Sequence, residues 1–488
     1  MRKVVLVIGF LFLWIPEINL FAQGSDSIPA TKLFIRDIII EGNKVTKEKI
    51  FIRELIFHQG DTIEKMDLLP ALEQSKENLL NLSIFNFVSL DVQHYPGNKI
   101  DVIITVTERW YIWPTPILEM ADRNFSAFLE DFDWTHTNYG LWLKWNNFRG
   151  RNELLSAKVR LGYKEQYLLE YEKPNIGINQ NHKIAFGYSF MRQHRVNYQT
   201  LDNKPVYYKK FPEYALNLGD AYLAYTYRPG LYSKHKLRAH FLYDWLGDSV
   251  STLNPNYFGE GKDTLKGFRL DYVFNYDIRD SKVYPLDGHA FKVKVQRYGF
   301  GIIKDYPYNN WLLEGTSFYH KKLSNKIYIA NVTRAKISSN KEVPFIQQKA
   351  LGYAEYMTGY ERFVIDGSDF FISKFITKFQ ILKPTSFQLP LIKAKQFNKV
   401  HLAIYMNVLA DIGYVNNKSS YLDPSNDMAL DPSNYMANEL QYSFGIGLDF
   451  VTYYDKVFRM EYSINRYVKD GPEFRGFFFH LETPFFRW

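Results

Sequence analysis

Residue types that carry enzyme chemistry are scattered along this chain rather than grouped. The 488 residues include 11 histidines and no cysteine, which excludes a cysteine nucleophile, a thiolate metal site and a disulfide framework. The sequence has no Gly-x-Ser-x-Gly elbow, no His-Glu-x-x-His pair and no phosphate-cradling glycine loop. Scattered histidines on strands are usually structural, so the sequence predicts no enzyme, no metal site and no cofactor.

One stretch, residues 351–368 (LGYAEYMTGYERFVIDGS), combines backbone freedom with rings and charges. Its glycines, Gly352, Gly359 and Gly367, mark positions where the backbone needs unusual freedom. The stretch lies between two segments of strand character and is too aromatic for a loop that trails in water. It is therefore expected to fold back into the structure that its flanking strands form.

The composition indicates what that structure is. The chain has 37 Tyr and 39 Phe, yet its mean hydropathy is −0.30. A transmembrane β-barrel explains both values, because only alternate residues face lipid and aromatic girdles lie at each interface. A helical membrane protein would be far more hydrophobic.

The formal charge of +8 is unevenly distributed, with −3 over residues 31–108 and +11 over residues 109–488. The basic excess is dispersed and no nucleic-acid motif accompanies it, so no nucleic-acid partner is expected. A basic lumen and basic loops that face acidic lipid headgroups or substrate fit this distribution better.

Residues 1–22 have the features of a secretory signal peptide. Arg2 and Lys3 precede an apolar run from Val4 to Ile15, and Ala22 suits cleavage. A membrane anchor is the alternative, but the run is short for a spanning helix, which needs ~20 residues. The chain is therefore expected to be exported and to enter a membrane only as strands.

Residues 31–108 predict a small α+β domain of order strand, helix, helix, strand, strand. Thr46 is expected to be the N-cap of the first helix, and Pro96-Gly97-Asn98 predicts a hairpin turn. The expected elements are Leu33–Glu41, a helix after Thr46, Met66–Leu82, Phe87–Tyr95 and Ile100–Thr107.

An aromatic, proline-bearing linker, residues 109–114, precedes a barrel over residues 115–488. Apolar and polar residues alternate along many segments; Tyr442, Phe444 and Ile446, for example, oppose Ser443 and Gly445. Sixteen antiparallel strands are expected, an even number, as a closed barrel prefers. A soluble sandwich is the minor alternative. The strands are expected to begin near residues 115, 139, 153, 165, 182, 219, 235, 268, 289, 309, 326, 370, 400, 439, 456 and 474.

Five groups of residues follow one another along the chain in a pattern that can be compared with known families. They are Gly42, Asn43, Gly60, Phe85 and Glu108 in the small domain; Asp277, Arg279, Asp280, Pro285 and Gly288 in a hairpin; Gly352, Gly359, Tyr360 and Glu361 in the glycine-rich stretch; Asp411 and Gly413 on the strand after it; and the terminal Phe486 and Trp488. Together they resemble the BamA/TamA superfamily of outer-membrane assembly factors, which combines POTRA domains with a bacterial surface antigen barrel. The resemblance implies one POTRA domain in the periplasm, a barrel in the outer membrane, a lumen loop with an Arg-Gly-aromatic motif and a C-terminal insertion signal.

One position departs from the family pattern. The family arginine, which the resemblance places in contact with Asp411, falls on Thr358. An arginine–carboxylate pair would be a charge-assisted bond, whereas threonine offers a neutral one. Arg362 is expected to supply the charge instead; packing of the loop aromatics is the alternative.

The resemblance also implies a mechanism, in which the first and last strands form a weak seam that templates a client strand. The expected partners are unfolded outer-membrane or secreted polypeptides, the bilayer and accessory proteins. A dedicated secretion pore and a passive channel are the alternatives. Only about eight residues are expected between the cleavage site after Ala22 and the small domain, so the plug helix of a two-partner pore is not expected here, and a passive porin would not need the N-terminal domain.

Overall fold

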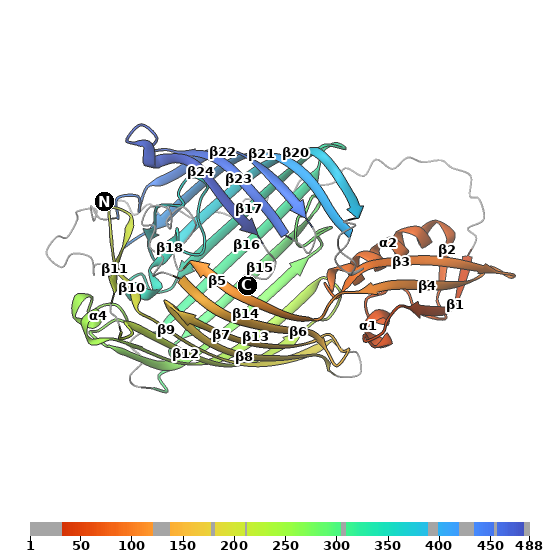
Figure 1. Ribbon diagram of the computed structural model, residues 1–488, viewed down its shortest axis with the longest axis horizontal. Coiled ribbons are helices and arrows are strands. Elements are labelled where there is room, and N and C mark those ends of the chain that lie inside the picture. The colour runs from red at the N-terminus through yellow and green to blue at the C-terminus, as the bar shows by residue number, and fades with distance from the viewer. Residues whose placement is uncertain are drawn as a thin grey trace, which may run out of the picture.

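The computed structural model describes residues 32–120, 137–176, 181–209, 212–303, 309–388, 399–418, 434–452 and 456–482. A small α+β domain adjoins one end of a large antiparallel barrel (Figure 1). The expected signal peptide, residues 1–22, and the terminal Phe486 and Trp488 lie outside the described residues.

The small domain is a four-stranded sheet with two helices. Its strands lie in the order β2-β1-β4-β3, with β1 parallel to β4 and β3 antiparallel to β4. The expected order of elements is confirmed, with a short additional strand between the helices. The elements are β1 (Lys32–Glu41), α1 (Glu48–Ile52), β2 (Thr62–Glu64), α2 (Lys65–Asn81), β3 (Phe85–Tyr95) and β4 (Lys99–Glu108).

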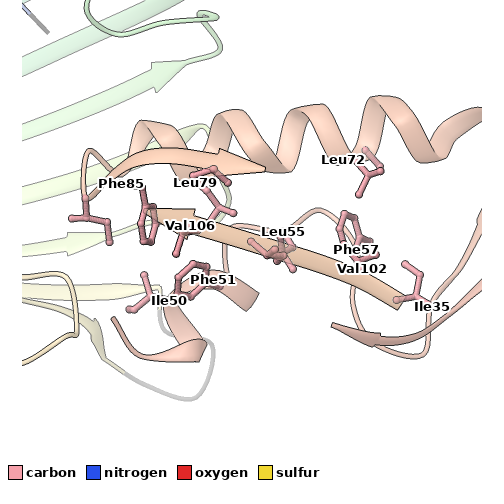
Figure 2. Packing of buried hydrophobic residues seen from close by; sticks show 14 of the residues in the cluster. Ile35, Ile50, Phe51, Leu55, Phe57, Leu72, Leu79, Phe85, Val102 and Val106 are labelled. Atoms are coloured by element: carbon pink, nitrogen blue, oxygen red, sulfur yellow. The ribbon is translucent and has the colours of Figure 1, made fainter. Parts of the chain in front are cut away.

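Apolar side chains from both helices and the sheet meet in one core (Figure 2). Phe51 of α1 and Phe85 of β3 are fully buried, and their ring centroids lie 5.0 Å apart. Alternate residues of β4, among them Val102 and Val106, point into the same core. The period-2 pattern therefore buries its apolar face against helices in this domain.

The barrel is one sheet of sixteen antiparallel strands, as expected. Its first strand begins at Ile112, inside the expected linker, and carries Pro114 and Pro116 at the edge of the sheet, where proline is tolerated. The strands are β5 (Ile112–Met120), β6 (Thr137–Phe148), β7 (Glu153–Gly162), β8 (Lys164–Ile176), β9 (His182–Gln193), β12 (Leu216–Tyr227), β13 (Ser233–Leu246), β14 (Thr264–Asp277), β15 (Gly288–Tyr298), β16 (Asn310–Lys322), β17 (Ile327–Ser338), β20 (Asp369–Gln388), β21 (Lys399–Asn416), β22 (Leu440–Thr452), β23 (Lys456–Asn465) and β24 (Arg475–Glu482).

The two faces of this sheet differ in polarity. On β22, Phe444 and Ile446 are at least half exposed on the outside, whereas Ser443 and Asp449 are buried inside. The same division recurs on neighbouring strands, so an apolar outer face surrounds a polar interior. Among the described residues, no helix is long and apolar enough to cross a membrane.

Loops with their own core lie at the end of the barrel opposite the small domain (Figure 1). They contain the hairpin of β10 (Arg195–Leu201) and β11 (Lys204–Lys209), and α4 (Asp248–Leu253). Val196, Val250 and Phe258 pack there against the ends of β12, β13 and β14. This end of the barrel is therefore capped by packed structure.

At the other end, the small domain contacts the barrel turns. Thr46 does not cap α1, which begins at Glu48 without a side-chain cap. Its hydroxyl lies 2.9 Å from the Tyr111 hydroxyl and accepts a 2.8 Å bond from Asn147 Nδ2 in the β6–β7 turn. The tertiary contact with the barrel thus overrides the local capping preference of threonine.

A buried ion pair joins the same two regions. Glu54, at the end of the α1 segment, accepts two bonds from the Arg228 guanidinium in the β12–β13 turn, at 2.8 and 3.1 Å. Both side chains are largely buried, with exposed fractions of 3% and 17%. Lys47 N–H also donates to the Gly150 carbonyl at 2.9 Å. The domain is therefore docked on the barrel by several specific bonds.

Candidate functional site

The connection between the eleventh and twelfth barrel strands, β17 and β20, folds into the barrel. It contains η2 (Phe345–Gln347) and the paired strands β18 (Lys349–Leu351) and β19 (Ile365–Asp366). We call residues 351–368 the lumen loop. Its buried residues and the inner wall form one apolar cluster, which includes Leu351, Met357, Tyr360, Phe363, Ile372, Val415 and Phe474.

Two glycines make this close packing possible. Gly352 has φ +89°, and a Cβ at this position would lie 2.1 Å from the Phe363 carbonyl oxygen. Gly413, on the inner face of β21, would place a Cβ 2.6 Å from the Met357 sulfur. The loop therefore folds tightly on itself at Gly352, and Met357 of the loop packs directly against the wall at Gly413.

Thr358 reaches Asp411 through its main chain. Its N–H donates a 2.8 Å bond to Asp411 Oδ2. The Lys374 ammonium, on the neighbouring strand β20, lies 3.7 Å from the same oxygen. A backbone donor and a wall lysine therefore engage the carboxylate that the family arginine would contact. That Arg362 supplies the charge remains a prediction.

Further polar contacts anchor the loop. The Tyr360 hydroxyl donates to Gln441 Oε1 at 3.0 Å, and Asn465 Nδ2 donates to the Gly359 carbonyl at 2.7 Å. The Tyr356 ring stacks on His480 of β24, with ring centroids 5.7 Å apart. The loop is thus attached to the last three strands of the barrel, β22, β23 and β24.

Asn203, in the turn of the β10–β11 hairpin, ties the outer loops to the lumen loop. This fully buried side chain donates to the Val364 carbonyl at 2.8 Å and accepts from Met436 N–H at 3.1 Å. Val364 N–H donates in turn to the Asn203 carbonyl at 2.8 Å. The sequence did not point to Asn203, because an Asp-Asn turn is an ordinary hairpin signal.

The hairpin motif between β14 and β15 reaches inward at the end beside the small domain. Arg279 binds Asp277 through two bonds, at 2.9 and 2.7 Å, and the Leu286 N–H is shared between the two carboxylate oxygens of Asp280. Gly288 has φ +93° and would place a Cβ 2.5 Å from the Ile278 carbonyl oxygen. These bonds give the turn a fixed shape.

The same turn contacts the far wall. Lys378 of β20 donates to the Pro285 carbonyl at 3.1 Å, and the Tyr284 hydroxyl donates to Asp449 of β22 at 2.8 Å. Lys282 also donates to the carbonyl of Asn81, at the end of α2, at 3.4 Å. The motif therefore links the small domain to the barrel interior, which the sequence did not predict.

The family residues of the small domain make contacts within that domain. Gly42 has φ +87° and meets the Val106 carbonyl. The Glu108 carboxylate accepts bonds from Val45 N–H and from Thr46 N–H, the latter at 2.7 Å. Among the remaining matches, Asn43 donates to the Thr46 carbonyl, Gly60 N–H donates to the Ile35 carbonyl, and Phe85 is in the core.

The first and last strands of the barrel, β5 and β24, are the two ends of the sheet. Within the described residues no backbone pairing joins them, whereas every other neighbouring pair of barrel strands is paired. We call this boundary the seam. Leu118 of β5 and Phe477 of β24 are 80% and 70% exposed, which is high for large apolar side chains.

Comparisons with known proteins agree with this architecture. A model of the Omp85 superfamily domain matches residues 147–479, and a POTRA model, the surface antigen variable number repeat, matches residues 33–109. Over 140 residues the chain is 28% identical to a Treponema pallidum (strain Nichols) protein described as "Putative outer membrane protein assembly factor". That match spans 28% of this chain and only 15% of the length of the relative.

Solved structures show the same fold. BamA from Haemophilus ducreyi lacking POTRA domains 1-3 superposes with a TM-score of 0.53 at 15% identity, covering 92% of this chain and 84% of that one. CdiB from Escherichia coli gives a TM-score of 0.56 at 12% identity, covering 92% and 76%.

The family match covers most of the barrel, and the POTRA match covers the small domain, which confirms the resemblance seen in the sequence. The chain therefore belongs to the Omp85 superfamily, as an outer-membrane β-barrel with its POTRA domain in the periplasm.

Proposed function

We propose that this protein inserts or translocates polypeptides at the outer membrane and templates client strands at the seam. Its family and fold are those of assembly and transport factors. The observation that carries the proposal is the seam, where β5 and β24 are unpaired with each other within the described residues. Unpaired backbone groups cannot face lipid without a large cost, so such an edge accepts another strand.

The sequence of β5 favours a weak seam. Pro114 and Pro116 have no N–H, so this edge offers fewer donors to β24 than an ordinary strand would. Gly476 adds backbone freedom on the opposite strand. A client strand with a full set of backbone donors and acceptors would compete well with such a pairing.

The POTRA domain supplies a second edge. Strand β3 lies at the end of its sheet and pairs with β4 on one side, while the opposite edge strand, β2, has only three residues. We propose that extended client segments add to β3 before they reach the seam. This role requires no catalytic residue and no cofactor, and accessory proteins would contact the same domain.

The proposal is tested by reconstitution in liposomes with a urea-unfolded outer-membrane barrel as client. Client folding is expected to be faster than in empty liposomes. If folding is not accelerated and large steady ion conductance appears instead, a secretion pore or passive channel is favoured.

A cross-link at the seam provides the mechanistic test, because the chain has no native cysteine. Leu118→Cys is combined in turn with Phe477→Cys and with Phe479→Cys. The control pair is Ile446→Cys with Tyr462→Cys, which face each other on β22 and β23. Oxidation is expected to stop client folding in a cross-linked seam variant but not in the control. Equal activity in both would show that clients do not use the seam.

A further inference from the structure

Three side chains that can bind a metal ion meet between the lumen loop and the last two strands. Glu361 belongs to the loop, Glu461 to β23 and His480 to β24, and one ligand atom from each lies within 4.8 Å of the other two. Both glutamates are buried, with 2% and 4% exposed, and the His480 side chain is 13% exposed. The sequence predicted no metal site, because these residues are far apart in the chain.

The His480–carboxylate separations are longer than a typical charge-assisted hydrogen bond. His480 Nε2 lies 3.5 Å from Glu461 Oε1 and 3.9 Å from Glu361 Oε1. A charge-assisted N–H···O bond would be about 2.7–2.9 Å long. Ligands at about 2.0–2.2 Å from a tetrahedral ion are about 3.4 Å apart by geometry. The His480–Glu461 separation therefore matches that of two ligands of one tetrahedral ion, and the His480–Glu361 separation is wider.

Neighbouring groups orient the three ligands. The Tyr356 hydroxyl lies 3.2 Å from His480 Nδ1, on the side of the ring away from the carboxylates, and the Tyr356 ring stacks on the imidazole. Gly359 N–H donates to Glu361 Oε1 at 3.2 Å. Such partners commonly fix the tautomer and direction of metal ligands.

A buried hydroxyl lies beside the cluster. Ser463, two residues after Glu461 on the same face of β23, is 1% exposed, and its oxygen has no hydrogen-bond partner within the described residues. It faces Gly359, 3.5 Å from where a Cβ on that glycine would lie. Buried hydroxyls normally bond to something, and a metal-bound water would provide that partner.

We propose that Glu361, Glu461 and His480 bind one divalent transition-metal ion, with Zn²⁺ as the best match. An imidazole nitrogen with carboxylate oxygens favours such ions over Ca²⁺ and Mg²⁺, which prefer oxygen alone. The ion would bridge the lumen loop to β23 and β24, next to the seam. Its role is to hold the loop on the last strands, and this binding does not depend on the proposed insertase activity.

The test uses the full-length protein in detergent after chelator treatment. Calorimetric titration with Zn²⁺ is expected to give one equivalent bound by the wild type. Loss of a residue that only orients a ligand typically weakens metal binding by about 10–100-fold. Tyr356→Phe is therefore expected to weaken Zn²⁺ binding by about 10-fold. Glu461→Gln and His480→Asn each remove a ligand and are expected to weaken Zn²⁺ binding more than that. The matched controls are Glu314→Gln, a lumen glutamate of β16 beside Lys294, and His320→Asn, a buried lumen histidine of β16. Both are expected to bind as the wild type does.

Folding of each variant is checked by the heat-dependent shift in gel migration of folded barrels. If the ligand variants do not fold, X-ray absorption of the Zn²⁺-loaded wild type tests the site directly. The expected coordination shell is one imidazole together with oxygen ligands, at about 2.0–2.1 Å from the ion. Absence of Zn²⁺ binding, unchanged binding in both ligand variants, or a shell of several imidazoles from surface histidines would each overturn the proposal.

Discussion

Strand β4 of the POTRA domain and strand β22 of the barrel both alternate apolar and polar residues, yet their apolar faces meet opposite surroundings. Val102 and Ile104 of β4 are fully buried against helices, whereas Phe444 and Ile446 of β22 are at least half exposed on the outside. A period-2 pattern fixes only that the two faces differ. The pattern does not decide whether the apolar face packs on helices of the same protein or faces lipid. That difference distinguishes the two regions.

The largest expected effect comes from the POTRA core. Phe51→Ala removes a fully buried ring that packs on Phe85, and it is expected to lower the free energy of unfolding of this domain by about 3–5 kcal/mol. The matched barrel change is Phe444→Ala, on a ring that is 55% exposed, and its effect is expected to be much smaller. Urea titration with limited proteolysis measures both. Equal losses would contradict the assignment of the outer face to lipid.

The next largest effect is expected where the two regions meet. Glu54→Gln leaves the Arg228 guanidinium buried without its carboxylate and is expected to weaken docking by about 2–5 kcal/mol. Hydrogen exchange at α1 and at the β12–β13 turn should rise while the barrel strands stay protected. The control, Glu48→Gln, changes an exposed glutamate of α1 and should leave exchange unchanged. If both variants behave alike, the ion pair does not fix the domain.

In the loops of the barrel, substitutions at two glycines distinguish the cost of backbone strain from the cost of lost packing. Gly261 and Gly352 both have positive φ, but a Cβ meets open space at Gly261 and the Phe363 carbonyl at Gly352. Gly261→Ala should cost only the about 1–2 kcal/mol of the left-handed conformation. Gly352→Ala should cost more and release the lumen loop, seen as new protease cleavage within residues 351–368. Cleavage that does not change would show that the loop tolerates a displaced carbonyl.

A smaller effect is expected at Asp411. Asp411→Ala removes the acceptor of Thr358 N–H and should destabilise loop docking by about 1–3 kcal/mol. Thr358→Ala keeps the main-chain bond and should have a much smaller effect. Thr358→Arg should not stabilise the loop, because Thr358 is buried and its Cγ2 lies 3.1 Å from where a Cβ on Gly445 would be. Protease protection of the loop measures all three variants. Increased protection in Thr358→Arg would show that an arginine at this position can contact Asp411, as the family pattern implies.

The smallest effect is a pH dependence confined to the POTRA domain. A hydrogen bond from the half-exposed Arg36 lowers the pKa of the Asp101 carboxyl. Because the folded-state pKa is depressed, the stabilisation is present above the unfolded value of about 3.9 and is lost as the pH falls through the lower, folded value. Arg36→Gln should therefore flatten the loss of POTRA stability below about pH 4, measured as urea midpoints. An unchanged acid slope would show that this pair is not responsible.

The local pattern of the sequence was sufficient to predict much of the architecture. It predicted the strand–helix–helix–strand–strand order before the barrel, the sixteen strands and the loop between the eleventh and twelfth. Strand β24, for example, begins at Arg475 and was expected near residue 474. Periodicity, turn residues and the spacing of motifs are properties of short segments, so they can be recognised without knowing what packs on them.

Tertiary structure alone decided the contacts that make the site. Thr46 is a good local cap but is held by Tyr111 and Asn147 instead. Asp411 is reached by a main-chain N–H that any residue except proline could offer at position 358. The approach of Glu361 to His480 depends on how the loop folds inside the barrel wall. Such pairs lie far apart in the chain and carry no local signal, because their partners are chosen by the geometry of the barrel.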